Sequence, residues 1–165
     1  MSADSERRII AAIDPGNEGA VAILNGRGEL VEILDMPTSA ITVSGKARQI
    51  VSAPLLAMLL RAHDPAEVWM EQVHAGPQMG GVSAMSFGRG VGIIEGAVAM
   101  LGKPLTTVRP NEWKRVMRCP ADKDGARTRA MQIFPTCADL FRRKKDDGRA
   151  EAAMIGAFAV RVATG

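Results

Sequence analysis

A continuous apolar run, Ile9 to Ile13, stands near the start of the chain and ends at Asp14-Pro15-Gly16. A strand that is apolar at every position offers no face to water, so both of its faces must be covered. The run therefore predicts a central strand of a sheet that has helices on either side. Asp14, followed by a proline and a glycine, marks the end of this strand.

The segments that follow indicate three strands in succession and then an alternation of helix and strand. A Pro, Thr, Ser and Gly loop separates the two parts. The expected elements are strands at 20–24 and 30–34, joined by the hairpin turn Asn25-Gly26-Arg27-Gly28, a helix from a Ser52 cap to His63, a strand at 68–70, a helix at 83–101, a strand at 105–108, basic helical pieces and a helix at 149–162. We expect one α/β domain over residues 1–165, with residues 1–7 flexible. It is built on a mixed five-stranded sheet that is flanked by helices and whose first three strands are antiparallel.

This topology brings acidic residues from distant parts of the chain to one end of the sheet. Right-handed crossovers place the strand 68–70 beside the strand 9–13. Asp14 and Glu71, which end these two strands, then lie at a similar depth on neighbouring strands. In the last helix, Glu151 shares the core-facing stripe and lies one turn from Asp147.

The composition excludes several classes of protein. A chain with 47% hydrophobic residues and a formal net charge of +3 is not an acidic disordered protein. No apolar stretch approaches the roughly 18 residues of a membrane span, and the polar residues 1–8 do not resemble a signal peptide. Cys119 and Cys137 suggest neither a disulfide framework nor a zinc site. We expect a cytoplasmic protein of a bacterial cell, encoded by the bacterium, a phage or a prophage, with no membrane partner.

Basic residues gather in the C-terminal third of the chain. Between Arg109 and Arg149, twelve Lys or Arg stand against six Asp or Glu, while the rest of the chain carries nine basic and twelve acidic residues. Clustered cations are what phosphate binding requires. The segment favours a polyanionic partner, although a solvated helical surface explains the charges alone equally well.

Several carboxylates in one pocket need compensation, because each would otherwise cost several kcal/mol or take up a proton. A divalent cation removes this cost, and oxygen ligands without a Cys or His cluster favour Mg²⁺ or Mn²⁺ over zinc. Two such ions about 4 Å apart can activate a water and stabilise the leaving oxygen of a phosphodiester. The simpler alternatives are that Asp14 is a turn residue, Glu71 pairs with an arginine, Asp147 caps the last helix and Glu151 is solvated.

Six spaced segments then carry a resemblance: Ile13-Asp14-Pro15-Gly16, Met70-Glu71-Gln72-Val73-His74, Ser86-Phe87-Gly88-Arg89, Arg109-Pro110-Asn111-Glu112-Trp113-Lys114, Phe134-Pro135 and Lys145-Asp146-Asp147-Gly148-Arg149-Ala150-Glu151-Ala152. Together they cover nearly the whole chain and resemble the RuvC-type Holliday junction resolvases, with the short phage and prophage branch as the nearest likeness. The resemblance implies an RNase H-like fold and a Mg²⁺-dependent endonuclease that acts on four-way or branched DNA as a homodimer. The glycines at 88, 90 and 92 do not directly follow a strand, so we expect no nucleotide cofactor.

The resemblance also implies roles for single residues. Asp14 corresponds to the aspartate of the first strand that bridges two metal ions, and Glu71 to the glutamate of the fourth strand. Asp147 and Glu151 correspond to the acidic pair of the last helix. The four carboxylates are thus the expected metal ligands and catalytic acids, for two Mg²⁺ ions that Mn²⁺ can replace.

Two features depart from the bacterial pattern. The bacterial acids of the last helix stand three residues apart, whereas Asp147 and Glu151 stand four apart and Gly148 occupies the position three before Glu151. Asp146 is therefore a substitute candidate. The loop at 75–86 also lacks the aromatic residue that enters the junction in the bacterial enzymes, which puts a strict cleavage-sequence preference in doubt.

Lys114 and Lys123 resemble the active-site lysines of the family, which contact the scissile region or neutralise developing charge. For both residues a plain surface lysine is the alternative. The expected DNA-binding residues are Arg89, Lys114, Arg115, Lys123, Arg142, Arg143 and Lys144.

The sequence supports a nuclease that makes paired cuts in branched DNA, but it leaves two other functions open. One is a non-catalytic branched-DNA-binding protein whose carboxylates only hold an ion. The other is an RNA-directed hydrolase of the same fold, since the sequence does not indicate whether a 2′-hydroxyl is read. A phosphotransferase of the actin and sugar-kinase type needs two domains, which 165 residues do not supply.

Overall fold

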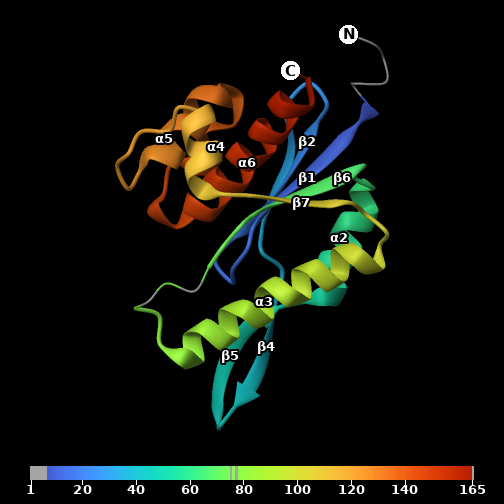
Figure 1. Ribbon diagram of the computed structural model, residues 1–165, viewed down its shortest axis with the longest axis vertical. Helices are drawn as coiled ribbons and strands as arrows, with labels where there is room; N and C mark the ends of the chain where they lie inside the picture. Colours follow the sequence, from blue (N-terminus) through green and yellow to red (C-terminus); the bar gives the residue numbers. More distant parts are fainter. Residues whose placement is uncertain (1–6, 75, 77, 165) are drawn as a thin grey trace.

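A five-stranded sheet in the order β3-β2-β1-β6-β7 forms the centre of the molecule in the computed structural model (Figure 1). The structure describes residues 7–164 except 75 and 77, so the segment expected to be flexible, 1–7, lies outside the described residues apart from Arg7. The strands are β1 (Ile9–Asp14), β2 (Ala20–Asn25), β3 (Leu30–Asp35), β6 (Glu67–Glu71) and β7 (Leu105–Val108). β1, β2 and β3 pair antiparallel, whereas β6 is parallel to β1 and to β7. The predicted mixed sheet is confirmed.

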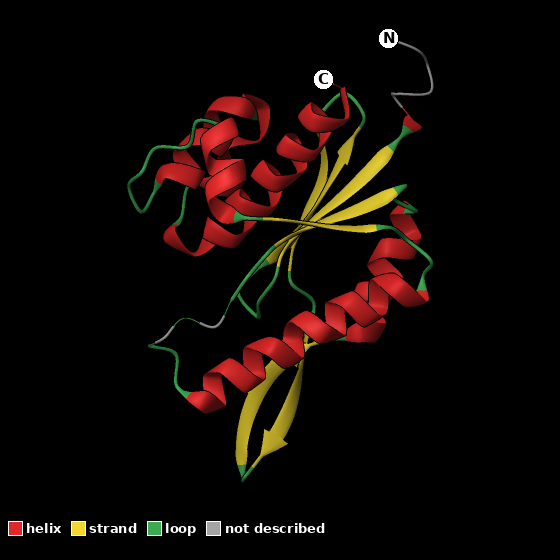
Figure 2. Cartoon of the chain, viewed as in Figure 1, coloured by secondary structure: helices red, strands yellow, loops and turns green. Residues whose placement is uncertain are grey.

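Helices cover both faces of this sheet (Figure 2). One layer holds α2 (Ala53–His63) and α3 (Gly81–Met100), and the other holds α4 (Pro110–Val116), α5 (Gly125–Ile133), the short 3-10 helices η1 (Pro135–Phe141) and η2 (Lys144–Asp146), and α6 (Asp147–Thr164). The central strand divides its side chains between the two layers. Ala11 and Ile13 pack into the core beneath α2 and α3, while Ala12 packs into the core beneath α6. Burial on both faces explains why every position of this strand before Asp14 is apolar.

Helix α6 is the most deeply buried helix of the described residues, because the sheet covers one side of it and α4 and α5 cover the other. The amphipathic stripe predicted for it is only part of its apolar surface, since Ala152, Ile155 and Ala159 are also fully buried. No helix in the described part of the chain is long and apolar enough to cross a membrane.

The prediction of a loop between β3 and α2 is wrong for most of these residues. They form a hairpin of β4 (Thr38–Val43) and β5 (Lys46–Val51). Its two turn residues, Ser44 and Gly45, have φ values of 50° and 74°. Positive φ at both central positions is the pattern of a two-residue hairpin whose twist matches the strands. The hairpin is a separate two-stranded sheet beside α3 (Figure 1).

Gly156 is required where α6 lies on β2, because a Cβ atom there would stand 2.2 Å from Leu24 Cδ1, and Leu24 is fully buried. We expect Gly156→Ala to lower the free energy of unfolding by about 1–2 kcal/mol, since overpacking outweighs the gain in helix propensity. Gly92→Ala in α3 is the matched control: nothing lies within 4 Å of its added Cβ, and we expect about 0.5–1 kcal/mol of stabilisation. Urea unfolding measures both, and equal stabilisation by the two variants would contradict the packing argument.

Candidate active site

Three carboxylates from three elements meet at the carboxyl ends of β1 and β6. Ile13 pairs with Met70 in the parallel register, so Asp14 and Glu71, the next residue of each strand, are neighbours. Glu151 extends to them from the second turn of α6. One oxygen of each of the three carboxylates lies within 4.8 Å of the others. We call Asp14, Glu71 and Glu151 the carboxylate triad.

Helix α4 contributes two consecutive side chains to the triad. Trp113, which is fully buried, donates a hydrogen bond from Nε1 to Glu71 Oε1 at 2.9 Å. Lys114 Nζ lies 3.0 Å from Glu151 Oε1 and 5.0 Å from the centre of the Trp113 ring. Among the described residues no arginine pairs with Glu71, so the alternative of such an ion pair is wrong. Sequence reasoning gave Trp113 no role, although its place directly before the predicted active-site lysine was a usable signal.

The triad carries more negative charge than its surroundings balance. Burial raises the pKa of Asp14 well above its usual value, and the charges of Glu151 and Glu71 raise it further. Burial also raises the pKa of Glu71, against the hydrogen bond from Trp113. Burial alone would lower the pKa of Lys114, but its hydrogen bond to Glu151 and the nearby carboxylates raise it, so this side chain stays positive. One lysine facing three carboxylates leaves a demand for further positive charge.

Asp147, the fourth predicted ligand, lies outside the triad. Its Oδ1 lies 2.6 Å from Arg127 Nε, and the Arg127 side chain is only 8% exposed. Arg127 also donates a hydrogen bond to the Arg142 carbonyl at 3.0 Å. The expectation that Asp147 shares the pocket with the other acids is thus corrected, because a buried arginine holds its carboxylate elsewhere. The sequence analysis counted Arg127 only as one of many basic residues.

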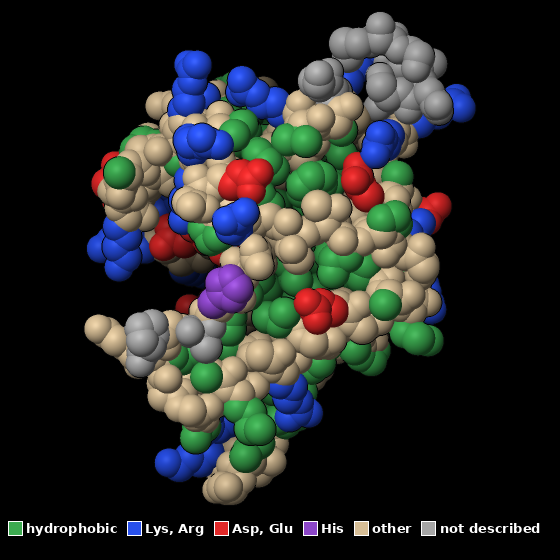
Figure 3. All heavy atoms as spheres, in the orientation of Figure 1, with side chains coloured by type: hydrophobic (Ala, Val, Ile, Leu, Met, Phe, Trp, Pro, Cys, Tyr) green, Lys and Arg blue, Asp and Glu red, His purple; other side chains and the backbone are tan. Residues whose placement is uncertain are grey.

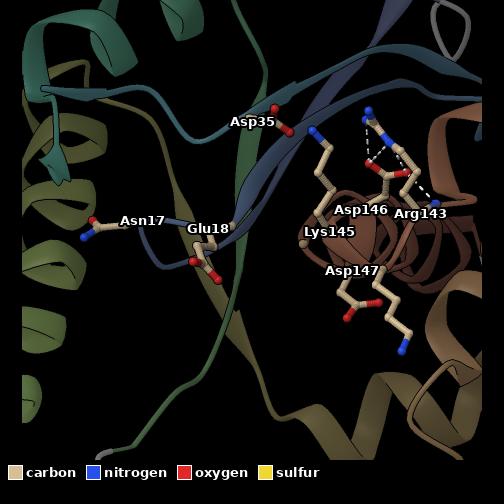
Figure 4. Close-up of a pocket in the computed structure, with 10 residues that line it drawn as sticks. Asn17, Glu18, Asp35, Arg143, Lys145, Asp146 and Asp147 are labelled. Carbon is tan, nitrogen blue, oxygen red and sulfur yellow. Dashed lines mark hydrogen bonds and ion pairs between the residues drawn. The ribbon is translucent and has the colours of Figure 1, made fainter.

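Asp146, the substitute candidate, is also held away from the triad. It is 1% exposed, and its carboxylate accepts hydrogen bonds from the Arg143 backbone N–H and from Arg143 Nη2, each at 2.8 Å (Figure 4). These bonds keep the pKa of Asp146 below its usual value. Asp146 therefore stabilises the turn before α6.

Gly148 explains why only one acid of α6 meets the strands. A Cβ atom at Gly148 would stand 2.5 Å from the Glu18 carbonyl oxygen, 2.9 Å from Gly19 Cα and 3.1 Å from Asp14 Oδ2. The first turn of α6 thus passes too close to the turn after β1 for any side chain at this position. The position where the bacterial pattern has an acid is filled by the backbone of the neighbouring turn.

The predicted basic residues fall into two groups on either side of the N-terminal turns of α6, and Arg89 lies apart from both. Lys114, Arg115 and Lys123 line a cavity of about 260 Å³ that includes Glu151. Arg143 and Lys144 line a second cavity of about 360 Å³, with Glu18 and Asp147 (Figure 4). Of the remaining two, Arg142 is exposed and pairs with Asp139 at 2.8 Å, and Arg89 lies on α3 beside the β4–β5 hairpin.

The surface is hollowed between these basic helices and α3. Figure 3 shows the hollow at the left of this face, with acidic side chains visible inside it. The arrangement gives the triad an open approach with cations on the α4–α6 side. A polyanion that entered from this side would meet Lys or Arg before it reached the carboxylates.

No family model and no curated protein matches the chain. Among solved structures, the fold is similar to RuvC of Thermus thermophilus in complex with a Holliday junction substrate, with a TM-score of 0.67, 17% identity and 96% of each chain covered. The fowlpox virus Holliday junction resolvase gives a TM-score of 0.56 and 17% identity over 94% of this chain and 99% of that one. The yeast mitochondrial resolvase Ydc2 gives 0.59 and 11% identity over 95% and 80%. The predicted RNase H-like fold of the RuvC-type resolvases is confirmed, and the phage branch stays a prediction.

The raised pKa of Asp14 predicts how stability depends on pH without divalent ions. The Asp14 carboxyl holds its proton more tightly in the folded protein than in the unfolded chain. The stability that this proton contributes is therefore fully present below the usual pKa of 3.8 and is lost as pH rises through the raised pKa. In EDTA at pH 7 we expect Asp14→Asn to raise the free energy of unfolding by ~1 kcal/mol, which corresponds to a rise in Tm of about 2–4 °C. The exposed Glu95→Gln is the control and should leave Tm unchanged. Parallel curves of Tm against pH for Asp14→Asn and the unaltered protein would contradict this.

Proposed function

We propose that this protein is a metal-dependent, structure-selective endodeoxyribonuclease that resolves Holliday junctions or other branched DNA by paired phosphodiester hydrolysis. The observation that carries the proposal is the carboxylate triad, with one oxygen of each residue within 4.8 Å of the others, on an RNase H-like fold. The Thermus thermophilus and fowlpox virus proteins, which share this fold, were solved in complex with Holliday junction DNA. These neighbours support branched DNA as the substrate.

The donor set of the triad fits a hard divalent cation. It offers only carboxylate oxygens, which Mg²⁺ and Mn²⁺ prefer. Burial, and after it the charge of Glu151, raises the pKa of Asp14 and of Glu71, so a cation that neutralised these carboxylates would relieve an unfavourable group. We infer that Asp14, Glu71 and Glu151 hold Mg²⁺, with two ions per site as the family resemblance implies. Bound ions of this kind lower the pKa of a water and stabilise the leaving oxygen of a phosphodiester. The geometry gives no support for Asp147 as a ligand.

The other side chains near the triad orient it and receive the DNA. Trp113 fixes the Glu71 carboxylate through its N–H and favours the ionised form that a ligand requires. Lys114 is 42% exposed, so it can hold Glu151 and still reach a phosphate at the mouth of the site. Arg115 and Lys123 on one side of α6 and the residues 142–144 on the other are then contacts to the flanking phosphates.

A homodimer completes the proposal, because paired cuts in a junction of nearly two-fold symmetry need two sites related by a two-fold axis. The alternatives remain a protein that binds branched DNA without cutting it and a hydrolase directed at RNA. Both share the fold and the triad, so the substrate assay below decides among the three.

Cleavage of synthetic four-way, Y-shaped, linear and RNA–DNA hybrid substrates tests the function directly. We expect symmetric nicks in the branched DNA with Mg²⁺ and none in EDTA. Asp14→Asn and Glu71→Gln should each reduce cutting by at least about 100-fold, since they remove ligands and not supporting groups, while junction binding persists. Glu95→Gln, on the exposed surface of α3, should cut normally. Mg²⁺-dependent cutting that survives in both triad variants would remove the proposed chemistry, and cutting of the hybrid alone would favour the RNA-directed hydrolase.

Metal binding separates the triad from the acids that the structure places elsewhere. We expect Glu151→Gln to weaken Mn²⁺ binding by at least about tenfold and Asp147→Asn to change it by less than about twofold, because Arg127 holds the Asp147 carboxylate. Electron paramagnetic resonance of free Mn²⁺ measures both without reference to cleavage. Equal loss in the two variants would restore Asp147 as a ligand.

A further inference from the structure

A second cleft lies next to the triad, on the side of α3, and none of the residues assigned above lines it. One wall is the turn after β1, with Gly16, Asn17 and Glu18, and the facing wall is the N-terminal half of α3. Arg48 of β5 also lines the cleft, whose volume is about 570 Å³. This volume falls within the range of pockets that hold small ligands.

The turn that forms the first wall is held in place from two directions. The Gly19 N–H donates a hydrogen bond to the Gly16 carbonyl at 3.1 Å, and a Cβ at Gly19 would stand 2.0 Å from the Asp14 carbonyl oxygen. Asn17 Nδ2 donates a hydrogen bond to the Gln49 carbonyl of β5 at 2.7 Å. The β4–β5 hairpin, which the sequence analysis did not predict, is thus hydrogen-bonded to the turn that follows Asp14. A ligand in the cleft would therefore have a fixed position relative to the triad.

The second wall is one face of α3 that is not built for burial. Ser83, Ser86, Phe87 and Gly90 follow the i, i+3, i+4, i+7 spacing of a single helix face. A face that packs on a core is apolar at these positions, whereas this one carries two hydroxyls and a single aromatic ring. Phe87 Cε2 lies 3.9 Å from the position that a Cβ of Gly16 would take. A half-buried aromatic ring therefore stands beside the turn, two residues from Asp14.

The two charged residues of the cleft lie toward opposite ends of it. Glu18 also lines the cavity that contains Asp147, whereas Arg48 also lines the groove that contains Arg89. Within the described part of the chain, the Arg48 side chain makes no hydrogen bond and no ion pair, although its backbone pairs with Ile41 of β4. Its guanidinium is therefore available to a ligand, and Glu18 repels anions from the other end.

We propose that this cleft binds one unpaired nucleotide of the DNA substrate, with its base against the Phe87 ring and its phosphate on Arg48. An aromatic side chain stacks on any base whose face is open, but both faces of a base inside a duplex are covered by its neighbours. The Ser83 and Ser86 hydroxyls can bond the edge of such a base. Base pairs at a branch point open at lower cost than base pairs inside a continuous duplex, so a cleft that takes up an unpaired base favours branched over linear DNA. The inference rests on the proposed function for its substrate class.

The test measures binding of the whole protein in EDTA, where no cutting is expected. The probes are a four-way junction and a duplex with one bulged 2-aminopurine, each compared with the same duplex fully paired. Phe87→Leu keeps the apolar volume but loses the ring, and we expect it to weaken bulge binding relative to paired duplex by about 5- to 100-fold and to abolish the change in 2-aminopurine fluorescence that binding produces. Phe87→Trp should retain both. Arg48→Ala should weaken bulge binding, whereas Arg61→Ala, an exposed arginine of α2, should not.

The outcomes separate this inference from the nuclease assignment. Equal preference for bulged over paired DNA in Phe87→Leu, Arg48→Ala and the unaltered protein would overturn the nucleotide cleft, even if junctions are cut. Loss of preference in these two variants supports the cleft even if no substrate is cut, in which case the nuclease proposal falls alone. A bulged RNA duplex as a third probe shows whether the bound nucleotide must be DNA, and preference for RNA would overturn the DNA substrate class.

Discussion

Repulsion among three carboxylates is the unfavourable interaction that the rest of this structure must overcome. Asp14, Glu71 and Glu151 come from two strands and a helix, and each would lower its energy by moving apart or by taking up a proton. They stay together because the strands are locked in one sheet and α6 is buried against it. The apolar cores on the two faces of the sheet thus hold a charged group that is unfavourable without a cation.

The close approach of α6 to the sheet decides which of its residues take part. Gly156 lets the helix lie on Leu24, and Gly148 lets its first turn pass the turn after β1. With the helix axis fixed in this way, Glu151 is the acid of α6 that lies with the carboxylates of β1 and β6. The basic residues on either side of α6 are fixed by the same placement, which is why cations flank the triad. Helix α3 bounds the opposite side of the same opening (Figure 3).

Features that depend on contacts between residues far apart in the chain were not predicted from the sequence. The β4–β5 hairpin was hidden because its Pro, Thr, Ser and Gly content also suits a loop, although its two-residue Ser44-Gly45 turn is a hairpin signal. Asp147 and Glu151 look equivalent by spacing, and only the buried Arg127 distinguishes them. The bond from Trp113 to Glu71 joins residues whose relation no local pattern encodes.

By itself, the sequence determined the order of the five strands of the central sheet and of the long helices, the acidic residues at the ends of β1 and β6, and the concentration of positive charge in the last third. These properties follow from local periodicity and composition, which a chain carries before it folds. Only the tertiary structure decided which carboxylates meet, which arginines are used up in structural pairs and where a cleft opens beside them. Those outcomes depend on distances of a few ångströms between segments far apart in the chain, and packing alone sets such distances.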